Sequence, residues 1–451
     1  MDSNIHRKIN VLELHSSLSY AGCQRNMVTF AKTLDRNIFV PHVASYNEGG
    51  WYENELAREG IPYVVGNGTS APILRAIAQW DIDVIHIHRS GHTNRLETEI
   101  IKGAHALKKD MVVIEKNVFG KHDPICERHI TCSFFQSMMH LNERYLVASG
   151  APFDFKREKV LYNMVNGKEF DRYRVSATVI NEYKKKLEIP PDHFVVGRIG
   201  RPAINKWSDL ILDVIPYLLN RVPKTTFVLM GVPPSRQQRI KKSMHASAVR
   251  VLPDTDDQQA VHLFYQAIDV LAHSSKIGEC NGNTINEAMF WQKPVVVNST
   301  PNKDNGQLEQ VQHMVTGIVA NYPQTYARAL AYLYENPEAR AAMGATACRT
   351  VIERNNPEVI TRMFEKAIIE HRSKTDHVIE QIRSRYAHIS YEPTESAIVS
   401  YKTEYKKRCA WEFGLLSFKE RIVHALRFSN RLYWKARDFL EDKNIIRIHY
   451  G

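Results

Sequence analysis

Two carboxylates stand eight positions apart where a polar loop runs into a predicted helix. Glu279 lies in the loop, which also carries Gly282, Asn283 and Thr284, and Glu287 lies inside the helical segment that follows. The backbone N–H groups at the start of such a helix attract anions. One carboxylate in the loop and another within the helix could therefore bind neutral hydroxyl groups beside a bound phosphate. This combination of groups suits a nucleotide sugar.

Two basic residues, Arg201 and Lys206, share one turn directly after a predicted strand at residues 194–199. Both could reach the same diphosphate. Transfer of a sugar from a nucleotide needs such charge, because the departing diphosphate must be neutralised either by a metal or by fixed cations. No Asp-x-Asp pair stands at a strand end where it would hold a metal, so we expect fixed cations and no metal. Arg198, which forms a similar Gly-Arg pair, is the alternative to Arg201.

The elements that must position these residues form two successive alternations of strand and helix. The first opens with a strand at 9–14, a turn at Ala21-Gly22 and a helix to Leu34, and its other strands are predicted near 39–45, 62–65, 83–88, 107–114, 129–134 and 160–164. The second has strands at 194–199, 226–230, 249–252, 268–272, 295–297 and 317–320. Repeated strand-helix units of this kind build doubly wound α/β domains. We therefore expect two such domains, joined near residue 165.

The strand at 83–88 ends in two alternating histidines, His86 and His88, which point to one face. Such a pair is ordinarily two surface or core histidines, but ligands collect at the carboxyl ends of parallel strands, so a functional role is an open alternative. The spacing would permit a pair of metal ligands, but no third ligand is evident nearby in the sequence.

The composition is typical of a globular protein with two domains and an appendage. The chain has 451 residues, of which 43% are hydrophobic and 24% charged, and a formal net charge of +11. No apolar run is long enough to span a bilayer, and the first residues are too polar for a signal peptide. Six scattered cysteines without a Cys-x-x-Cys pair favour a reducing cytoplasm over a disulfide framework or a zinc site. The positive charge favours anionic partners, although an ordinary basic surface is an equal interpretation.

The pattern changes at about residue 374, where a basic extension, residues 375–451, begins. Its apolar positions near one helical face are Leu415, Phe418, Ile422, Ala425, Leu426, Ser429 and Leu432, and its flanking charges are Lys419, Arg421, Arg427, Arg431, Lys435 and Arg437. A basic amphipathic helix can lie on an anionic bilayer, which would give peripheral membrane contact through residues 400–440. The other open interpretation is a helix that packs on its own domain or on a second copy of the chain.

Several short motifs in the right order resemble the retaining GT-B-fold glycosyltransferases of family 4, the "group 1" class. The resemblance spans residues 11 to 370. It is based on the motifs Ala21-Gly22 with Gln24-Arg25, the strand Asp83 to His88, the linker Asn163 to Asn166 with Phe170, the turn Gly200-Arg201 with Lys206, and Ser275 to Ala288 with its two Glu residues. The pair of Glu residues together with the Arg and Lys turn is the specific part, and the Gly loop and the His strand are supportive.

The resemblance implies a GT-B fold, in which two Rossmann-like doubly wound domains face each other across a cleft, here with a mostly helical C-terminal extension. It implies an N-terminal acceptor domain at 1–165, on which a helix at about 357–372 packs back, and a nucleotide-sugar donor domain at 166–356. The implied enzyme is a cytoplasmic hexosyltransferase, peripheral on the inner membrane face in one interpretation, that needs no cofactor or metal. It would use a UDP- or GDP-sugar and a glycan, lipid-linked or other hydroxyl acceptor, and it would bind no nucleic acid.

By the same resemblance, Arg201 and Lys206 stabilise the departing nucleotide, Glu279 faces the donor sugar and Glu287 holds the ribose hydroxyls. The backbone N–H groups of Gly282, Asn283 and Thr284 would meet phosphate or sugar oxygens. Gly22 would let the N-terminal loop approach the donor phosphate, and His88 and Asn117 would lie on the acceptor side.

The chain departs from the family pattern at Cys280 and Asn281 after the first Glu, and at Glu115-Lys116-Asn117, where a His is frequent. These departures leave the identity of the donor sugar open. Two alternatives to a transferase are a GT-B-fold nucleotide-sugar epimerase that needs no acceptor, and a non-enzymatic basic protein that binds nucleic acid or membrane.

Overall fold

The computed structural model describes residues 7–89, 94–117, 125–126, 128–131, 155, 158–301, 303–371 and 377–426. The chain divides into two compact units. Unit 1 comprises residues 1–164 and 355–399, and unit 2 comprises residues 165–354 and 400–451, so the chain passes from one unit to the other after residues 164, 354 and 399.

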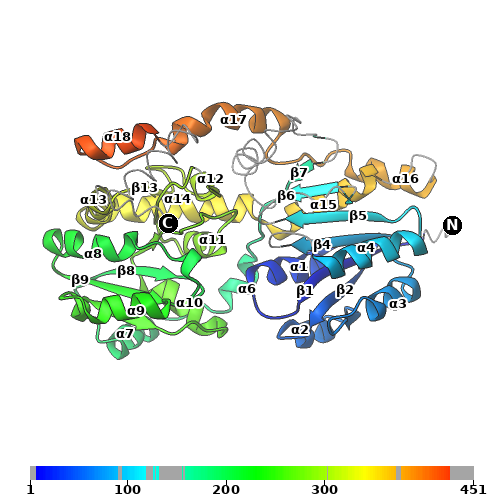
Figure 1. The fold of residues 1–451 in the computed structure, drawn as a ribbon, viewed down its shortest axis with the longest axis horizontal. Coiled ribbons are helices and arrows are strands. Elements are labelled where there is room, and N and C mark those ends of the chain that lie inside the picture. The colour runs from blue at the N-terminus through cyan, green and yellow to red at the C-terminus, as the bar shows by residue number, and fades with distance from the viewer. Residues whose placement is uncertain are drawn as a thin grey trace. The chain divides into compact units, whose positions relative to one another are not determined.

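Among the described residues, unit 1 contains a parallel sheet of seven strands in the order β3-β2-β1-β4-β5-β6-β7 (Figure 1). The strands are β1 (Ile9–Ser17), β2 (Phe39–Glu48), β3 (Tyr63–Val65), β4 (Val84–Arg89), β5 (Val112–Asn117), β6 (Arg128–Thr131) and β7 (Glu158–Val160). Leu12 of β1 pairs with His42 of β2 on one side and with Ile85 of β4 on the other. The strand order therefore reverses between β1 and β4, which is where doubly wound sheets bind ligands.

The helices of unit 1 are α1 (Gly22–Thr33), α2 (Tyr52–Arg58), α3 (Ala71–Gln79), α4 (Arg95–Leu107), α15 (Pro357–His371), α16 (His377–Tyr386) and the first part of α17 (Glu395–Cys409). α15 returns from the far end of the sequence and packs on α1, where the rings of Phe30 and Phe364 lie 5.0 Å apart between centroids. A hydroxyl contact of 2.6 Å between Thr33 and Thr361 joins the same two helices.

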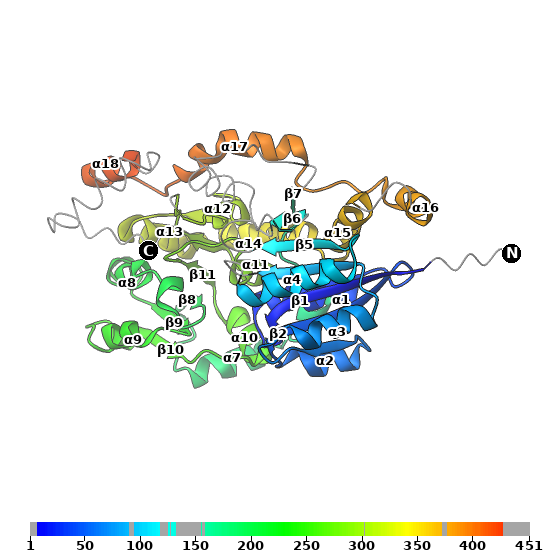
Figure 2. The same cartoon turned by 45° about the vertical axis from the view of Figure 1, so that its right-hand side comes forward.

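Unit 2 is built on a second parallel sheet, whose six described strands run in the order β10-β9-β8-β11-β12-β13 (Figure 2). They are β8 (Phe194–Ile199), β9 (Thr225–Met230), β10 (Val249–Leu252), β11 (Val270–His273), β12 (Val295–Val297) and β13 (Gly317–Val319). Gly197 in the middle of β8 pairs with Val228 of β9 and with Leu271 of β11. The reversal of strand order here lies between β8 and β11, directly at the two loops that carry the predicted donor residues.

The helices of unit 2 are α6 (Gly167–Asp171), α7 (Ala177–Lys186), α8 (Leu210–Arg221), α9 (Pro234–Lys241), α10 (Gln258–Ala267), α11 (Asn283–Phe290), α12 (Gln307–Gln310), α13 (Pro323–Glu335), α14 (Pro337–Arg354) and α18 (Phe418–Leu426), with 3-10 turns at Ile204–Lys206 and Ala246–Ala248. Several begin at side chains that accept a hydrogen bond from the first turn, such as Asn166 before α6 and Asp257 before α10. The last residues of α17, from Ser400, also belong to this unit.

Helices cover both faces of the second sheet, so its strands are buried on both sides. Val196 and Ile318 pack with α8 and α13 in one apolar cluster, and the neighbouring Val195 and Val319 pack with α10 and α11 in another. Each strand therefore reads as a nearly continuous apolar run. The predicted fold class of two Rossmann-like halves with a helical C-terminal part is confirmed.

None of the helices in the described ranges combines the length and the apolar content that a bilayer crossing requires.

Candidate functional site

Arg198, the alternative to Arg201, points into unit 2. Its side chain is only 1% exposed, and its guanidinium donates hydrogen bonds to the carbonyl oxygens of Lys206 (2.8 Å) and Ser274 (3.0 Å). It also lies 4.7 Å from the ring centroid of Trp207. These contacts tie the ends of β8 and β11 to the turn that follows β8. Arg198 thus shapes this turn, whereas Arg201 is exposed on it.

Lys206 and Glu279, which are 73 positions apart in the chain, meet at this edge of the sheet. The Lys206 ammonium nitrogen lies 3.0 Å from Oε2 of Glu279. His273, the last residue of β11, approaches the other carboxylate oxygen, with Nε2 at 3.3 Å from Oε1. Thr284 of α11 lies 3.4 Å from the second ring nitrogen of His273. The predicted cation and carboxylate therefore share one hydrogen-bonded group.

The charge states of this group follow from its burial and its neighbours. Burial raises the pKa of Glu279, but the Lys206 ammonium and His273 lower the pKa by more, so it lies below its ordinary value. Burial, followed by the charge of Arg198, lowers the pKa of His273 to about 4. At neutral pH Glu279 is thus a carboxylate and His273 is a neutral imidazole.

The loop that carries Glu279 is held by two glutamines from α12. Gln307 accepts a hydrogen bond from the backbone N–H of Glu279 (3.0 Å), and Gln310 accepts one from the N–H of Gly282 (2.8 Å). Gly282 is the N-cap of α11, which has no side-chain cap and no acidic residue in its first turn. The N–H of Gly282 is thus already hydrogen-bonded, and Asn283 and Thr284 form the start of the helix that an anion would approach.

Glu287 lies one turn into α11, where it is 6% exposed. The phenol of Tyr265 on α10 donates a hydrogen bond of 2.8 Å to its Oε2. Glu287 is thus a positioned carboxylate in the helix that follows the loop of Glu279, as hydroxyl recognition requires.

The predicted residues of unit 1 lie on three of its elements. Gly22 is the first residue of α1, after Ala21 in extended conformation. His88 of β4 is 1% exposed and lies 2.5 Å from Oε2 of Glu13 on β1. Asn117 is the last residue of β5, and its side chain lies outside the part that the structure describes.

Glu13 joins His86 and His88 as a third group, which the spacing of the two histidines did not reveal. One ligand atom from each of these three buried residues lies within 4.8 Å of the others. Burial, and after it the charge of Lys116, lowers the pKa of His86. For His88, burial, the charge of His86 and then Lys116 lower the pKa, and for Glu13 burial raises it against the charge of Lys116. The charge of Lys116 thus acts on all three groups of the cluster.

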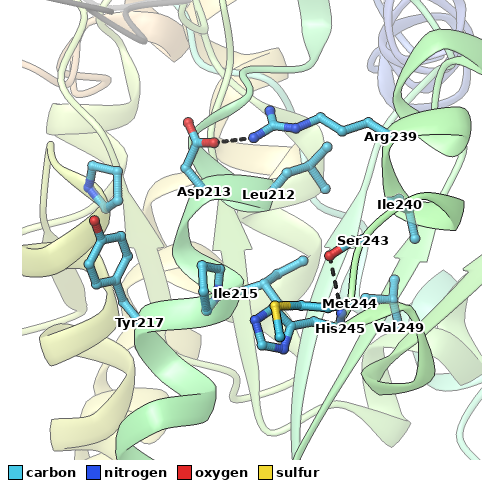
Figure 3. A pocket seen from close by; sticks show the side chains of 12 residues that line it. Leu212, Asp213, Ile215, Tyr217, Arg239, Ile240, Ser243, Met244, His245 and Val249 are labelled. Atoms are coloured by element: carbon cyan, nitrogen blue, oxygen red, sulfur yellow. Dashed lines mark hydrogen bonds and ion pairs between the residues drawn. The ribbon is translucent and has the colours of Figure 1, made fainter.

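A hollow of about 510 Å³ opens elsewhere on unit 2, between α8 and the segment from α9 to β10 (Figure 3). Its apolar wall includes Leu212, Ile215 and Val249, and Arg239 pairs with Asp213 at its rim. Val249 is the first residue of β10, whereas the predicted donor residues follow the last residues of β8 and β11. This hollow is therefore separate from the candidate site.

The motifs did not point to Tyr265, His273, Gln307 or Gln310. One signal was present for His273, because a histidine at the end of an apolar strand directly precedes the loop. The two glutamines are each 28 positions after their backbone partners, Glu279 and Gly282, so the two pairs keep the same spacing. Nothing in an isolated sequence marks that relation.

Comparisons with known proteins agree with this architecture. Residues 190–336 match the family model described as "Glycosyl transferases group 1". A search of curated proteins found no significant match.

Among solved structures, HepE from Anabaena in complex with UDP-glucose is similar at a TM-score of 0.61 and 19% identity, over 80% of this chain and 99% of that one. A glycosyltransferase from Rickettsia africae is similar at a TM-score of 0.68 and 17% identity, over 82% of this chain and 100% of that one. WaaG, a glycosyltransferase involved in lipopolysaccharide biosynthesis, has a TM-score of 0.55 and 13% identity, over 79% and 99%.

The TM-scores, over most of both chains, establish the fold, which is the GT-B architecture of two Rossmann-like halves. The matched residues 190–336 contain Arg201, Lys206, Glu279 and Glu287, so the group of side chains described above lies within the segment that is similar to the group 1 glycosyl transferases.

Proposed function

We propose that this protein transfers a sugar from a nucleotide-diphosphate sugar to a hydroxyl acceptor, as a family 4 enzyme that retains the anomeric configuration. The observation that carries the proposal is the contact between Lys206 and Glu279 at the carboxyl edge of the second sheet, beside the start of α11. A cation, a carboxylate and helix N–H groups are the three components that a nucleotide sugar requires. The pathway class is the synthesis of a glycan, a polysaccharide or a glycolipid.

Arg201 and Lys206 neutralise the departing diphosphate, so the reaction needs no metal. Lys206 is held by Glu279, and Arg201 is exposed on the same turn, where a phosphate can draw it in. Glu279 stays ionised and faces the sugar carbon on which positive charge grows. The acceptor attacks on the face from which the nucleotide leaves, and an oxygen of the leaving group takes up the acceptor proton.

Glu287 binds the ribose hydroxyls. Tyr265 holds one of its oxygens, which fixes the plane of the carboxylate before the donor arrives. The donor is a UDP- or GDP-sugar, and the UDP and UDP-glucose complexes of HepE support the first of these. Unit 2 is thus the donor half. Gly22 in donor binding, and His88 and Asn117 on the acceptor side, stay predictions for unit 1.

A thermal-shift screen with UDP, GDP, ADP and their sugars tests donor binding, because a ligand that binds only the folded state raises the apparent stability. We expect one nucleotide series to raise the melting temperature. A transfer assay with that donor should then show Lys206→Met lowering kcat by about a hundredfold and Glu287→Ala raising the donor KM. The control Lys224→Met removes an exposed lysine before β9, at the opposite edge of the sheet, and should leave both constants unchanged.

The epimerase alternative predicts a changed sugar on an intact nucleotide without any added acceptor. Normal turnover by the Lys206 and Glu287 variants would contradict the assignment of the site residues.

The extension adds a proposal about location. In the described part of the extension, Leu415 and Phe418 are each 79% exposed and Ile422 is 47% exposed, next to Lys419 and Arg421. An exposed apolar face flanked by basic residues fits an anionic membrane surface. The protein thus works peripherally at the cytoplasmic membrane face on a lipid-linked acceptor, and its binding to anionic vesicles tests this.

A further inference from the structure

The loop that carries Glu279 rests on a second loop of unit 2, residues 298–301 and 303–310, which we term the supporting loop. Besides the two glutamine contacts, the N–H of Gly306 donates to the carbonyl oxygen of Glu279 (2.6 Å). The backbones approach so closely that a Cβ on Gly278 would lie 1.5 Å from the carbonyl oxygen of Asp304. Any shift of the supporting loop therefore displaces Glu279.

Asn305 is the centre of the supporting loop. Its side-chain oxygen accepts hydrogen bonds from the N–H of Thr300 (2.8 Å) and from the side chain of Gln307 (3.1 Å). Gln307 is the residue that in turn accepts from the N–H of Glu279. The Gln307 amide also donates to the carbonyl oxygen of Asn298 (2.9 Å) and to the hydroxyl of Thr300 (2.8 Å). Asn305 is thus one of three groups that hold Gln307, and through Gln307 it contributes to the position of Glu279.

The other end of the Asn305 amide is directed at the C-terminal extension. Its nitrogen donates to the phenol oxygen of Tyr405 (3.4 Å) and to the sulfur of Cys409 (3.3 Å), both on α17. Tyr405 also donates to the carbonyl oxygen of Pro301 (3.2 Å). Cys409 is fully buried. The same nitrogen donates to the hydroxyl of Ser299 (3.3 Å) within the supporting loop. Because an amide has one donor end and one acceptor end, the contacts with α17 and Ser299 together fix which end faces Gln307.

The residues that follow α17 hold the end of this helix on unit 2. Glu412 accepts hydrogen bonds from the backbone and side-chain nitrogens of Asn321 (2.9 and 2.7 Å). The ring of Trp411 stacks on His313 at 5.9 Å between centroids. Figures 1 and 2 show α17 next to α12, which carries the two glutamines. All these extension residues lie beyond the segment 190–336 that matches the family model.

We propose that Tyr405 and Cys409 are positioning residues for the nucleotide-sugar site and act on Glu279 through Asn305 and Gln307. The proposal rests on the proposed function for the identity of the ligand, but not for the contact itself. The extension is then a structural part of the donor half, so loss of these two side chains loosens the loop at Glu279 and weakens donor binding.

The test is hydrogen exchange of the full-length chain, with and without UDP, in a double variant Tyr405→Phe/Cys409→Ala. We expect faster exchange in the peptides that cover 278–282 and 303–310, with no change in β8 or β9. The Kd for UDP should rise about tenfold, as for the loss of one buried hydrogen bond. The double variant Tyr405→Phe/Cys409→Ser, which keeps a polar group next to Asn305, should restore most of the protection.

Tyr322→Phe is the matched control. The Tyr322 phenol also joins unit 2 to the C-terminal extension, because it donates a hydrogen bond to the carbonyl oxygen of Glu420 (3.2 Å), but its partner is not Asn305. It should leave the exchange of 278–282 unchanged. Equal exchange in the double variant and the wild type, or equally fast exchange in the double variant and the control, overturns the proposal. If the double variant does not fold, Tyr405→Phe alone is compared with Tyr322→Phe. If the wild type binds no nucleotide, the proposed function is overturned. If the double variant still shows faster exchange at 278–282 and 303–310, the positioning contact stands on its own.

Discussion

The group formed by the partly exposed Lys206 and the buried Glu279 and His273 shows how one side chain changes the chemistry of another. Lys206 is usable as a cation for phosphate only if Glu279 can release it, and Glu279 keeps a second partner in His273. The imidazole is neutral because it is buried and because Arg198 lies nearby. A neutral donor can hold the carboxylate without adding charge to the donor-binding edge.

His273 predicts a pH dependence of stability. Its folded pKa of about 4 lies below the ordinary value of about 6.5, so the unfolded chain binds the extra proton first. Stability from this residue is therefore complete above pH 6.5 and is lost as the pH falls from 6.5 to 4. The loss amounts to about 3 kcal/mol at most, from 1.36 kcal/mol per pKa unit.

Urea unfolding of the wild type and His273→Gln between pH 7 and pH 4 measures this contribution. The variant should lose less stability across that range than the wild type. Parallel curves for the two proteins would show that His273 does not titrate as its burial implies.

At the scale of elements, the loop between β11 and α11 depends on one close backbone approach. Gly278 has φ of +76°, and the space where a Cβ would stand is filled by the carbonyl oxygen of Asp304. The supporting loop can thus lie directly on the loop that carries Glu279 only because Gly278 has no side chain. Within the supporting loop, α12 contacts the loop that carries Glu279, and Asn305 contacts α17.

Gly278→Ala should therefore destabilise unit 2 and weaken donor binding. The matched control is Gly68→Ala, because Gly68 has nearly the same φ of +78° but no atom within 4 Å of the added Cβ. The control should cost about 1 kcal/mol from the backbone conformation alone, and Gly278→Ala at least about 2 kcal/mol more. Equal losses in denaturant unfolding would contradict a tight approach at Gly278.

For the whole molecule, the extension contributes two surfaces to unit 2. One is buried on the supporting loop through Tyr405 and Cys409, and the other is the exposed apolar face of α18. On α18, Val423 is 5% exposed and the carbonyl oxygen of Glu420 accepts a hydrogen bond from Tyr322, whereas Phe418 and Ile422 are exposed. The contacts of Tyr405 and Cys409 thus show that the extension packs on its own unit, and membrane contact through α18 stays a proposal.

Membrane binding by α18 predicts that Phe418→Glu/Ile422→Glu lowers the fraction of protein that floats with anionic vesicles by at least about tenfold. Two charges placed on the apolar face that would enter the bilayer would remove most of the hydrophobic contribution to vesicle binding. Met244→Glu is the control, because Met244 is 90% exposed on the same unit but lies far from α18 in the sequence. Equal flotation of both variants and the wild type would contradict a role of α18.

The resemblance of the motifs to a known family implied the GT-B fold. The sequence alone was sufficient to predict the two strand-helix alternations and the two strands that precede Arg201 and Glu279. These features are local, because apolar periodicity and turn residues act over a few positions. It also identified residues 83–88 as a strand that brings His86 and His88 to one face.

Only the tertiary structure decided which side chains meet. Arg198 and Arg201 each directly follow a glycine. Packing against Trp207 nevertheless turns Arg198 inward, whereas Arg201 lies on the surface. Glu13 reaches His88 across 75 positions, Lys206 reaches Glu279 across 73, and Cys409 reaches Asn305 across 104. Such contacts depend on strand order and on the packing of distant segments, which no local pattern encodes.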